Sequence, residues 1–429
     1  MGERAGAAAS DGVRFAVRLL RSFLLLVVGF GLVSAVPPPE PIGWTRSDAG
    51  ELLQLIETVG SEGLDPADYE PGRLRSALQG GDPAALDAVA TALAVRLAGD
   101  FTAGHVSRES RISWHITGPS ADPERLRGIV ARSVAQHRIT DGLRELLPRN
   151  PAYLALRTAL ANLAPSDVAG RELLRANLER WRWMPRDLGS RYLLVNVPSF
   201  TVDLVENGWS IAQHRIIVGK TSLPTPQFSA TVTGVILNPW WNVPQSIIRE
   251  SVGRLVRNHP ARARAQGYVV TPRAGGGIQV SQGPGPKNSL GQMKLVMPNP
   301  FAVYLHDTPS KTLFEKPVRT FSHGCIRVDK AFDLAALLLR DVPGWDRAAI
   351  DRTVESRETT TISLPARMPV YVAYFTAVPD GAGGITRFDD IYDRDQAVID
   401  RLTDGNGEDV ESASLAPAAE TECALSARA

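Results

Sequence analysis

The stretch RYLLVNVPSFTVDLVENGWSIAQHRIIVG, residues 191–219, decides the fold of the second half of the chain. It contains three runs rich in β-branched residues, and Asn207-Gly208 separates the last two. An Asn-Gly pair between two such runs is a strong signal for a tight β-hairpin. The stretch therefore predicts three consecutive strands, the last two of which form a hairpin.

More strand candidates follow this stretch, joined by long Pro- and Gly-rich connections. We expect one helix after Asp329, in KAFDLAALLLRD. Long ordered loops on a β scaffold are where binding sites usually lie. The other strand candidates are 231–237, 293–297, 301–306 and 369–377.

The first half of the chain has helical patterns instead. Asp82-Pro83, Asp122-Pro123 and Asn150-Pro151 each place an N-cap residue before a proline at the first helical position. Behind Pro83, apolar residues recur at spacings of three and four, which predicts one buried stripe. The expected fold class is α+β, with a helical scaffold domain over 44–185 and a β-rich domain over 186–398.

The N-terminal segment has the pattern of an export signal. Three arginines precede the apolar run 23–36, and small residues at 33–35 would suit a signal peptidase that cleaves near Ala35. An uncleaved inner-membrane anchor is the alternative. Residues 1–35 are thus the signal or anchor and 36–43 a linker, so the remainder is expected in the periplasm or cell envelope. In either case the N-terminal segment contacts the inner membrane at least during export.

Composition and charge exclude some classes of protein. The formal net charge is +1, which gives no reason to expect a nucleic-acid partner. His105, His115 and His137 have no carboxylate or cysteine at ligand spacing, so we expect no metal site and no cofactor.

Only two cysteines occur in the 429 residues. Cys423 lies in AETECALSARA, within a tail (399–429) whose composition is typical of disorder, and would be a poor disulfide partner. Cys325 lies in TFSHGCIRVDK, residues 320–330. It is therefore a candidate functional thiol.

The residues near Cys325 suit nucleophilic catalysis. Gly324 allows a turn with amide N–H groups available to a developing oxyanion, and His306 closes a predicted strand 19 residues earlier. A loop that returns beside that strand could bring His306 within reach of the thiol. A buried structural thiol and a plain strand-end histidine are the alternatives for these two residues.

The motif YLHDTP…FSHGCIRV resembles the signature of the YkuD-type L,D-transpeptidases, which cross-link peptidoglycan. The resemblance extends over about 181–395, where NPWWNVP, NSLGQMKLVMPN and DDIYDRD are similar to the larger, YcbB-like branch. SEGLDPADY (61–69) resembles the start of the helical scaffold of that branch. The resemblance implies a β-sandwich-like catalytic domain, with 246–290 as a candidate lid over the site.

The resemblance also implies roles. Cys325 would attack a stem tetrapeptide, release D-Ala and form a thioester, and a diaminopimelate amine would resolve it into a 3→3 cross-link. His306 would be the base, with its ring oriented by a carbonyl near Asp307. Gly324 and Cys325 would form the oxyanion hole, and Ser322 and His323 would shape the loop. Carbapenems would acylate Cys325.

Two features depart from the family. Many members have Asn two residues after the cysteine, whereas this chain has Arg327 there, as the YcbB-like branch does. Arg327 is a candidate clamp for a substrate carboxylate or a member of a structural ion pair. The peptidoglycan-binding module usual in that branch is missing between NPAYLALRTALANLAP and SDVAGRELLRANLERW, so glycan must be held elsewhere or weakly. Tyr304, Trp241 and Arg319 are further candidates for substrate binding, with packing roles as the alternative.

Other functions stay open. The same thioester could be transferred to a protein or to water, since the sequence does not choose the acceptor. An inactive scaffold that binds stem peptides is a different class, and the presence of both His306 and Cys325 argues against it. A cysteine protease or a metal protein is weaker still, because no Cys/His cluster has zinc spacing.

Overall fold

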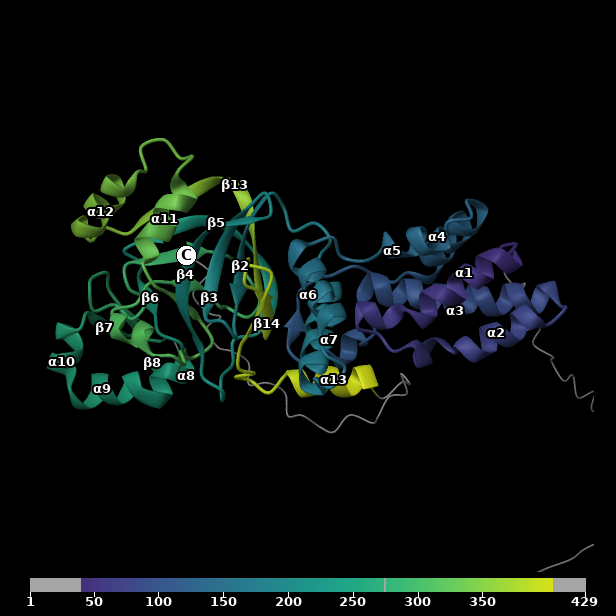
Figure 1. Ribbon diagram of the computed structural model, residues 1–429. Helices are drawn as coiled ribbons and strands as arrows, with labels where there is room; N and C mark the ends of the chain where they lie inside the picture. The colour runs from purple at the N-terminus through teal and green to yellow at the C-terminus, as the bar shows by residue number, and fades with distance from the viewer. Residues whose placement is uncertain (1–39, 274, 404–429) are drawn as a thin grey trace, which may run out of the picture. The chain divides into compact units, whose positions relative to one another are not determined.

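The computed structural model describes residues 40–273 and 275–403 (Figure 1). The expected signal or anchor, the first half of the linker (36–39) and Cys423 lie outside these ranges. Within them, no helix is both long enough and apolar enough to cross a membrane.

The first half of the described chain is mainly helical, and several helices begin where the sequence predicts. Asp82 accepts a hydrogen bond from Ala84 N, and Asn150 accepts one from Ala152 N, each at 2.9 Å. These caps start α3 and α6, because each satisfies a backbone N–H that has no partner within its helix. The helices are α1 (Arg46–Glu57), α2 (Pro71–Gln79), α3 (Pro83–Ala103), α4 (Pro123–Ala135), α5 (Ile139–Arg144), α6 (Pro151–Asn162) and α7 (Val168–Trp183).

One strand in this half was not predicted. β1 (Trp114–His115) pairs in parallel with β5 (Gln227–Leu237), with Trp114 opposite Gln227. Two residues are too few to produce a periodic pattern, so only the tertiary partner identifies them as a strand.

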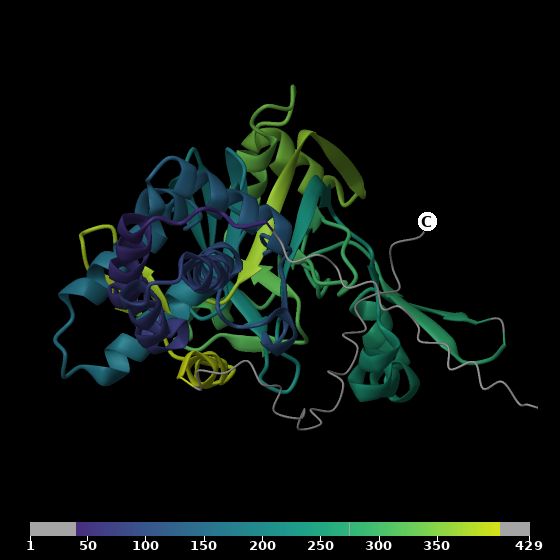
Figure 2. The same ribbon diagram turned by 90° about the vertical axis from the view of Figure 1, so that its right-hand side faces the viewer.

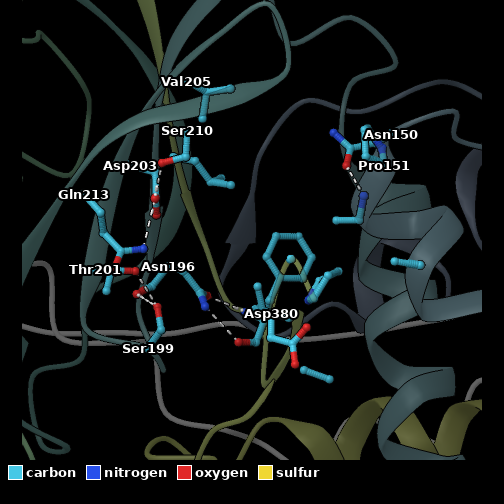
Figure 3. A pocket seen from close by; sticks show the side chains of 18 of the residues that line it. Asn150, Pro151, Asn196, Ser199, Thr201, Asp203, Val205, Ser210, Gln213 and Asp380 are labelled. Carbon is cyan, nitrogen blue, oxygen red and sulfur yellow. Dashed lines mark hydrogen bonds between the residues drawn. The ribbon is translucent and has the colours of Figure 1, made fainter. Parts of the chain in front are cut away.

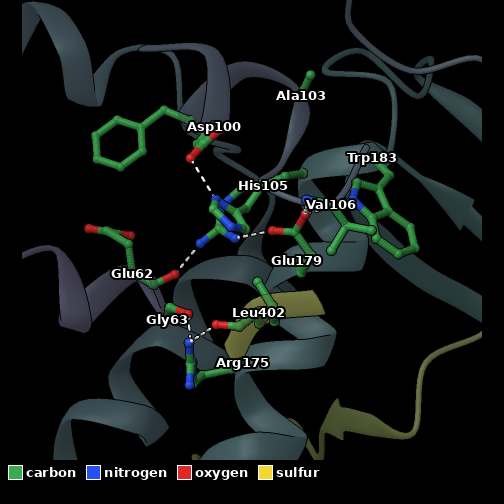
Figure 4. A network of polar contacts seen from close by, with 12 residues as sticks. Glu62, Gly63, Asp100, Ala103, His105, Val106, Arg175, Glu179, Trp183 and Leu402 are labelled. Carbon is green, nitrogen blue, oxygen red and sulfur yellow. Dashed lines mark hydrogen bonds and ion pairs between the residues drawn. The ribbon is translucent and has the colours of Figure 1, made fainter. Parts of the chain in front are cut away.

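A buried polar network ties α7 to the preceding loops and to α3 (Figure 4). Arg182 and Glu179 form a salt bridge of 2.6 Å, and both side chains are fully buried. Glu179 also accepts hydrogen bonds from Val106 N and Trp183 Nε1, while Arg182 donates to the Glu62 carbonyl. The charges are therefore paired and hydrogen-bonded, as burial requires.

Two histidines differ from the sequence expectation. His105 Nδ1 lies 2.9 Å from Asp100 Oδ2, and His137 Nδ1 lies 3.0 Å from Asp48 Oδ1. Both therefore have a carboxylate partner that the sequence analysis did not find. The Asp48–His137 contact joins residues 89 positions apart, which no local spacing reveals.

The second half is β-rich, which confirms the α+β class. One sheet has the strand order β1-β5-β13-β2-β3-β4-β12-β10-β9, and β9 also pairs with β5, so the hydrogen bonds close into a barrel. The hairpin prediction is confirmed, because Glu206 pairs with Trp209 across Asn207-Gly208. The strands are β2 (Arg191–Asn196), β3 (Thr201–Glu206), β4 (Trp209–Gly219), β9 (Met293–Val296), β10 (Leu305–His306), β11 (Thr320–Ser322), β12 (Ile326–Val328) and β13 (Thr360–Ala373).

The barrel interior is apolar. Leu193, Val202, Ile216 and Ile326 belong to one fully buried cluster. The helix expected after Asp329 is present as α11 (Ala331–Leu339); it joins this cluster, as does α12 (Arg347–Ser356).

The strand expected over 301–306 is shorter than predicted and contains only β10. Asn299 Nδ2 donates to Met297 O and Val303 O at 2.7 and 2.8 Å, and Ala302 has φ of 47°. This side-chain-supported turn competes with an extended backbone until Leu305.

Residues 241–290 form a small lobe with its own sheet and its own apolar cluster (Figure 2). We call it the capping lobe. It contains β6 (Trp241–Asn242), α8 (Gln245–Ile247), the π-helical turn Ile248–Val252, α9 (Gly253–Asn258), α10 (Pro260–Ala265), β7 (Tyr268–Pro272) and β8 (Ile278–Gln282).

The chain then returns to the helical half. β14 (Ala377–Pro379) and β15 (Ile385–Arg387) form a hairpin, and α13 (Asp395–Thr403) packs on α7. Arg175 of α7 donates to the Leu402 carbonyl at 2.9 Å and to the Gly63 carbonyl at 2.8 Å (Figure 4). The first of these bonds fixes the C-terminal part of α13 to α7.

Candidate active site

Cys325 and His306 lie on neighbouring parallel strands. In the β10–β12 pair, Leu305 is opposite Ile326 and His306 is opposite Arg327. Leu305 and Ile326 are fully buried in the barrel, so strand alternation places His306, Cys325 and Arg327 on the outer face. Cys325 immediately precedes β12 and is a diagonal neighbour of His306, within reach of side-chain interaction.

His306 is held as a neutral imidazole. Its ring is buried, and its Nδ1 lies 2.5 Å from Asp307 O and 3.3 Å from Leu290 O. These two acceptors assign the proton to Nδ1, which leaves the Nε2 lone pair to accept a proton. Burial, with Arg327 nearby, lowers the pKa of His306 to about 3. The ring is therefore neutral at any physiological pH.

Asp307 helps to fix this segment with its carboxylate as well as its carbonyl. Its Oδ2 accepts from Gln292 N at 2.9 Å, and its Oδ1 pairs with Lys311. A Cβ at Gly291 would lie 2.3 Å from Asp307 Oδ2, and Gly291 has φ of +64°. Glycine is required there, because a side chain would displace the residue that accepts from His306.

The loop before Cys325 is held by hydrogen bonds. Ser322 Oγ donates to Cys325 O at 2.5 Å, and Gly324, with φ of 106°, donates its N–H to Ser322 Oγ at 3.1 Å. Thr225 Oγ1 donates to Gly324 O at 2.9 Å. The Gly324 N–H would have to break its hydrogen bond to Ser322 Oγ before it could donate to an oxyanion, so its role in an oxyanion hole stays a prediction.

Two cationic side chains lie on the same face. Arg327 is partly buried. Burial lowers the pKa of its guanidinium, and the charge interaction with Cys325 offsets only part of this lowering. No ion pair within the described residues includes Arg327, so a structural salt bridge has no support there. Lys294, opposite His306 on β9, places Nζ 3.5 Å from the centre of the Tyr304 ring. A guanidinium beside a thiol favours the thiolate.

Trp241 and Arg319 have packing partners. The ring centres of Trp241 and Tyr268 are 6.5 Å apart, and Trp241 packs against the apolar cluster of the capping lobe. Arg319 donates to the carbonyls of Ile216, Lys316 and Phe200. Their proposed contacts with substrate stay predictions, and the geometry favours the packing alternative.

His323 connects the site to the capping lobe. Its Nε2 lies 2.9 Å from Glu250 Oε2, and Glu250 also lies 3.4 Å from Lys220 Nζ. His323 lowers the pKa of the Glu250 carboxyl, by hydrogen bonding and charge. These contacts hold the start of the lobe against the loop that carries Cys325.

Several residues of the site were not identified from the sequence. Thr225 accepts from Gly219 N, and Tyr392 donates to Gly219 O at 2.6 Å, so both support the Cys325 loop from distant segments. Glu250 and Lys294 were also missed. Tyr392 lies in the quoted stretch DDIYDRD, but nothing local indicates which of its residues reaches the site.

The comparisons with known proteins agree on the domain type. Residues 190–371 match the L,D-transpeptidase catalytic domain, YkuD, and residues 42–160 match the Scaffold domain. A putative L,D-transpeptidase of Haemophilus influenzae is 28% identical over 284 residues, which cover 62% of this chain and 57% of that protein. The match thus spans little more than half the length of this curated relative.

Solved structures overlap with part of the chain. An L,D-transpeptidase from Mycobacterium smegmatis is 14% identical, covers 43% of this chain and 58% of its own, and has a TM-score of 0.24. L,D-transpeptidase 1 of Mycobacterium tuberculosis is 12% identical, with coverage of 43% and 61% and a TM-score of 0.20.

Proposed function

Because the chain carries a YkuD-type L,D-transpeptidase catalytic domain preceded by a Scaffold domain, we propose that it cross-links peptidoglycan stem peptides through a thioester on Cys325. The observation that supports this most directly is the position of Cys325 on the same outer face as the neutral, hydrogen-bonded His306, on the neighbouring strand. A nucleophile beside an oriented base is the arrangement that acyl transfer needs.

The steps follow from these two residues. Cys325 Sγ attacks the carbonyl of the third residue of a tetrapeptide, and the bond to the terminal D-Ala breaks. The thiol proton moves to His306 Nε2 and then to the leaving amine. An acceptor amine, most simply that of diaminopimelate, attacks the thioester; a new amide forms and the thiol is restored. Arg327 stabilises the thiolate or holds a substrate carboxylate.

The first experiment incubates the chain with purified disaccharide-tetrapeptide and identifies products by mass spectrometry. We expect a dimer with loss of D-Ala for the wild type and none for Cys325→Ala. Cys423→Ala is the matched control, because it removes the other thiol of the chain. D-Ala release without a dimer would redirect the proposal to a protein or water as acceptor. Binding without release would favour the inactive scaffold.

The compartment is part of the proposal. We place the protein in the cell envelope, exported by residues 1–35, because the proposed substrate is extracytoplasmic. The reaction can proceed there without ATP, since the thioester keeps the energy of the cleaved amide. Fractionation of cells that produce the full chain or a chain without residues 1–35 tests this. Cytoplasmic recovery of both forms would contradict it.

Inhibition gives an independent check on the nucleophile. We expect a carbapenem to add its mass to the wild type and to Cys423→Ala, because a strained lactam is an acyl donor for a thiolate. Intact-mass measurement of Cys325→Ala should show no adduct. An adduct on that variant would assign the nucleophile elsewhere.

A further inference from the structure

A cavity of about 630 Å³ lies on another part of the outer barrel face (Figure 3). One wall is the outer face of β2, β3 and β4, with Asp203 and Gln213; the opposite wall is the start of α6 at Asn150. The β14–β15 hairpin borders it. None of the residues that line it belongs to the candidate active site. The size is within the range of small-molecule sites, about 300–1,000 Å³.

The base of this cavity is aromatic and rigid. Trp181 of α7 stacks on Phe375 with ring centres 4.6 Å apart and planes 12° apart. Tyr192 packs edge-on against Tyr371, 5.9 Å away, and Phe388 adds a fourth ring to the lining. Trp181, Phe375 and Tyr192 are each at most 5% exposed and form a rigid floor, while the partly exposed Phe388 offers apolar contact area to a ligand.

Polar groups in the cavity have unused hydrogen-bonding capacity. Ser210 Oγ and Gln213 Nε2 both donate to Oδ1 of Asp203, at 2.6 and 3.0 Å, so its Oδ2 can accept from a ligand. Tyr192 lines the cavity, and its hydroxyl has no hydrogen-bond partner among the described residues. That hydroxyl is not among the buried unpartnered polar atoms, so it is open to the cavity and can donate to a ligand.

The charges select the class of ligand. The lining contains two carboxylates, Asp203 and Asp380, and neither lysine nor arginine. The Asp380 carboxylate already accepts from Ala382 N and Gly384 N at 2.8 Å. A phosphate or a free carboxylate would therefore be repelled, whereas a neutral ligand rich in hydroxyls would find aromatic faces and acceptors.

We propose that this cavity binds an uncharged saccharide, namely a sugar unit of the glycan strand whose stem peptide is presented to Cys325. The assignment of that polymer rests on the proposed function. β4 connects the two places: Ser210 and Gln213 line the cavity, and Ile217 is opposite Arg327. Four residues along an antiparallel strand span roughly 14 Å. Three or four residues of extended peptide cover a similar length, about 10–14 Å.

The test measures binding of an uncharged N-acetylglucosamine tetramer to full-length Cys325→Ala, which cannot turn over, by calorimetry. Tyr192→Phe removes only the unpartnered hydroxyl, and we expect about tenfold weaker binding. Asp203→Asn should weaken binding by a similar factor. Tyr371→Phe is the matched control, since the Tyr371 hydroxyl donates to Leu188 O and does not line the cavity. Thermal unfolding of each variant confirms that it is folded.

Three results would overturn the proposal: no binding of the tetramer, binding that Tyr192→Phe leaves unchanged, or equal weakening by Tyr371→Phe. Because binding is measured without turnover, its outcome is separate from that of the transpeptidase test. A protein that binds the tetramer but forms no dimer would keep this site and lose the proposed activity. A protein that forms the dimer but does not bind the tetramer would keep the proposed activity and lose this site.

Discussion

The helical half and the outer face of the barrel both take arginine out of water, but they do so differently. Arg182 of α7 is fully buried and paired with Glu179; burial lowers its pKa, but Tyr153 and Glu179 more than compensate, so the pKa is raised. Arg327 of β12 is partly buried without a carboxylate in any ion pair of the described residues, and its pKa is lowered. Arg327 instead interacts electrostatically with the titratable groups of Cys325 and His306.

This difference separates a structural cation, Arg182, from a candidate functional cation, Arg327. Arg182 is paired through its terminal NH groups, although its Nε has no partner, and a buried charge paired in this way serves the fold rather than a substrate. A partly buried charge without a carboxylate partner loses hydration that no ion pair replaces. The residues around it are therefore candidates for a functional site. The following changes test whether this separation holds.

The largest expected effect is on turnover. We expect His306→Asn to lower the rate of D-Ala release by about 10²–10⁴-fold, because the thiol loses its proton acceptor. His214→Asn is the matched control: His214 is also buried with Nδ1 near a carbonyl, 3.0 Å from Asp329 O, but it lies on β4 away from Cys325. A similar loss of turnover in folded samples of both variants would contradict the assignment of the base.

The next effect is on stability. Arg182→Met should lower the free energy of unfolding by about 3–5 kcal/mol, because Glu179 would remain buried without its partner. Arg327→Met should change it by less than about 1 kcal/mol, since it breaks no ion pair. Urea unfolding measures both. The double variant Glu179→Gln/Arg182→Met should recover part of the loss, and failure to recover any would show that pairing is not the reason.

A smaller effect concerns the reactivity of the thiol. Arg327→Gln should slow alkylation of Cys325 by iodoacetamide about 10–100-fold at pH 7 and shift its pH profile upward, because a thiolate loses a neighbouring cation. Arg319→Gln should leave the alkylation rate unchanged, since that guanidinium donates to three backbone carbonyls. An unchanged pH profile in Arg327→Gln would assign Arg327 to substrate binding instead.

The smallest effect is a predicted absence of change. His306 has a lowered pKa of about 3, so it stays neutral as pH falls and becomes charged only near pH 3. We therefore expect kcat/KM to vary less than about twofold between pH 7 and pH 5 through this group. A loss of activity with a midpoint near 6.5, the ordinary value for histidine, would show that the ring is solvated during turnover.

Local sequence predicts part of this molecule well. Asn207-Gly208 identifies its hairpin because a two-residue turn needs left-handed backbone at both positions, and the structure has φ of 50° and 85° there. Asp82-Pro83 and Asn150-Pro151 identify helix starts because the capping atom and its N–H partner are two residues apart. Cys325 and His306 could be selected because few residue types supply a nucleophile and a base.

The remaining features depend on partners far along the chain. Thr225 and Gly324 are 99 residues apart, and Asn177 and Thr376 are 199 residues apart. Two-residue strands such as β1 and β10 exist only because a neighbour pairs with them. The cavity next to Asp203 is formed by α6, three strands and a later hairpin, so no segment of the sequence indicates it.

The closed ring of strands has a consequence for the emergence of drug resistance. Because the apolar core lies inside the barrel while Cys325 and Lys294 lie outside it, substitutions at such outer positions leave the packing of the core intact, whereas Tyr304 packs against the core. Under the proposed acylation of Cys325, selection by a covalent inhibitor would therefore reshape the surroundings of the thiol at little expense in folding stability. Gly291 and Gly324 are the exceptions, since one is sterically confined and both have left-handed backbone. An inhibitor that relies on contacts with those two backbone segments would face the fewest escape routes.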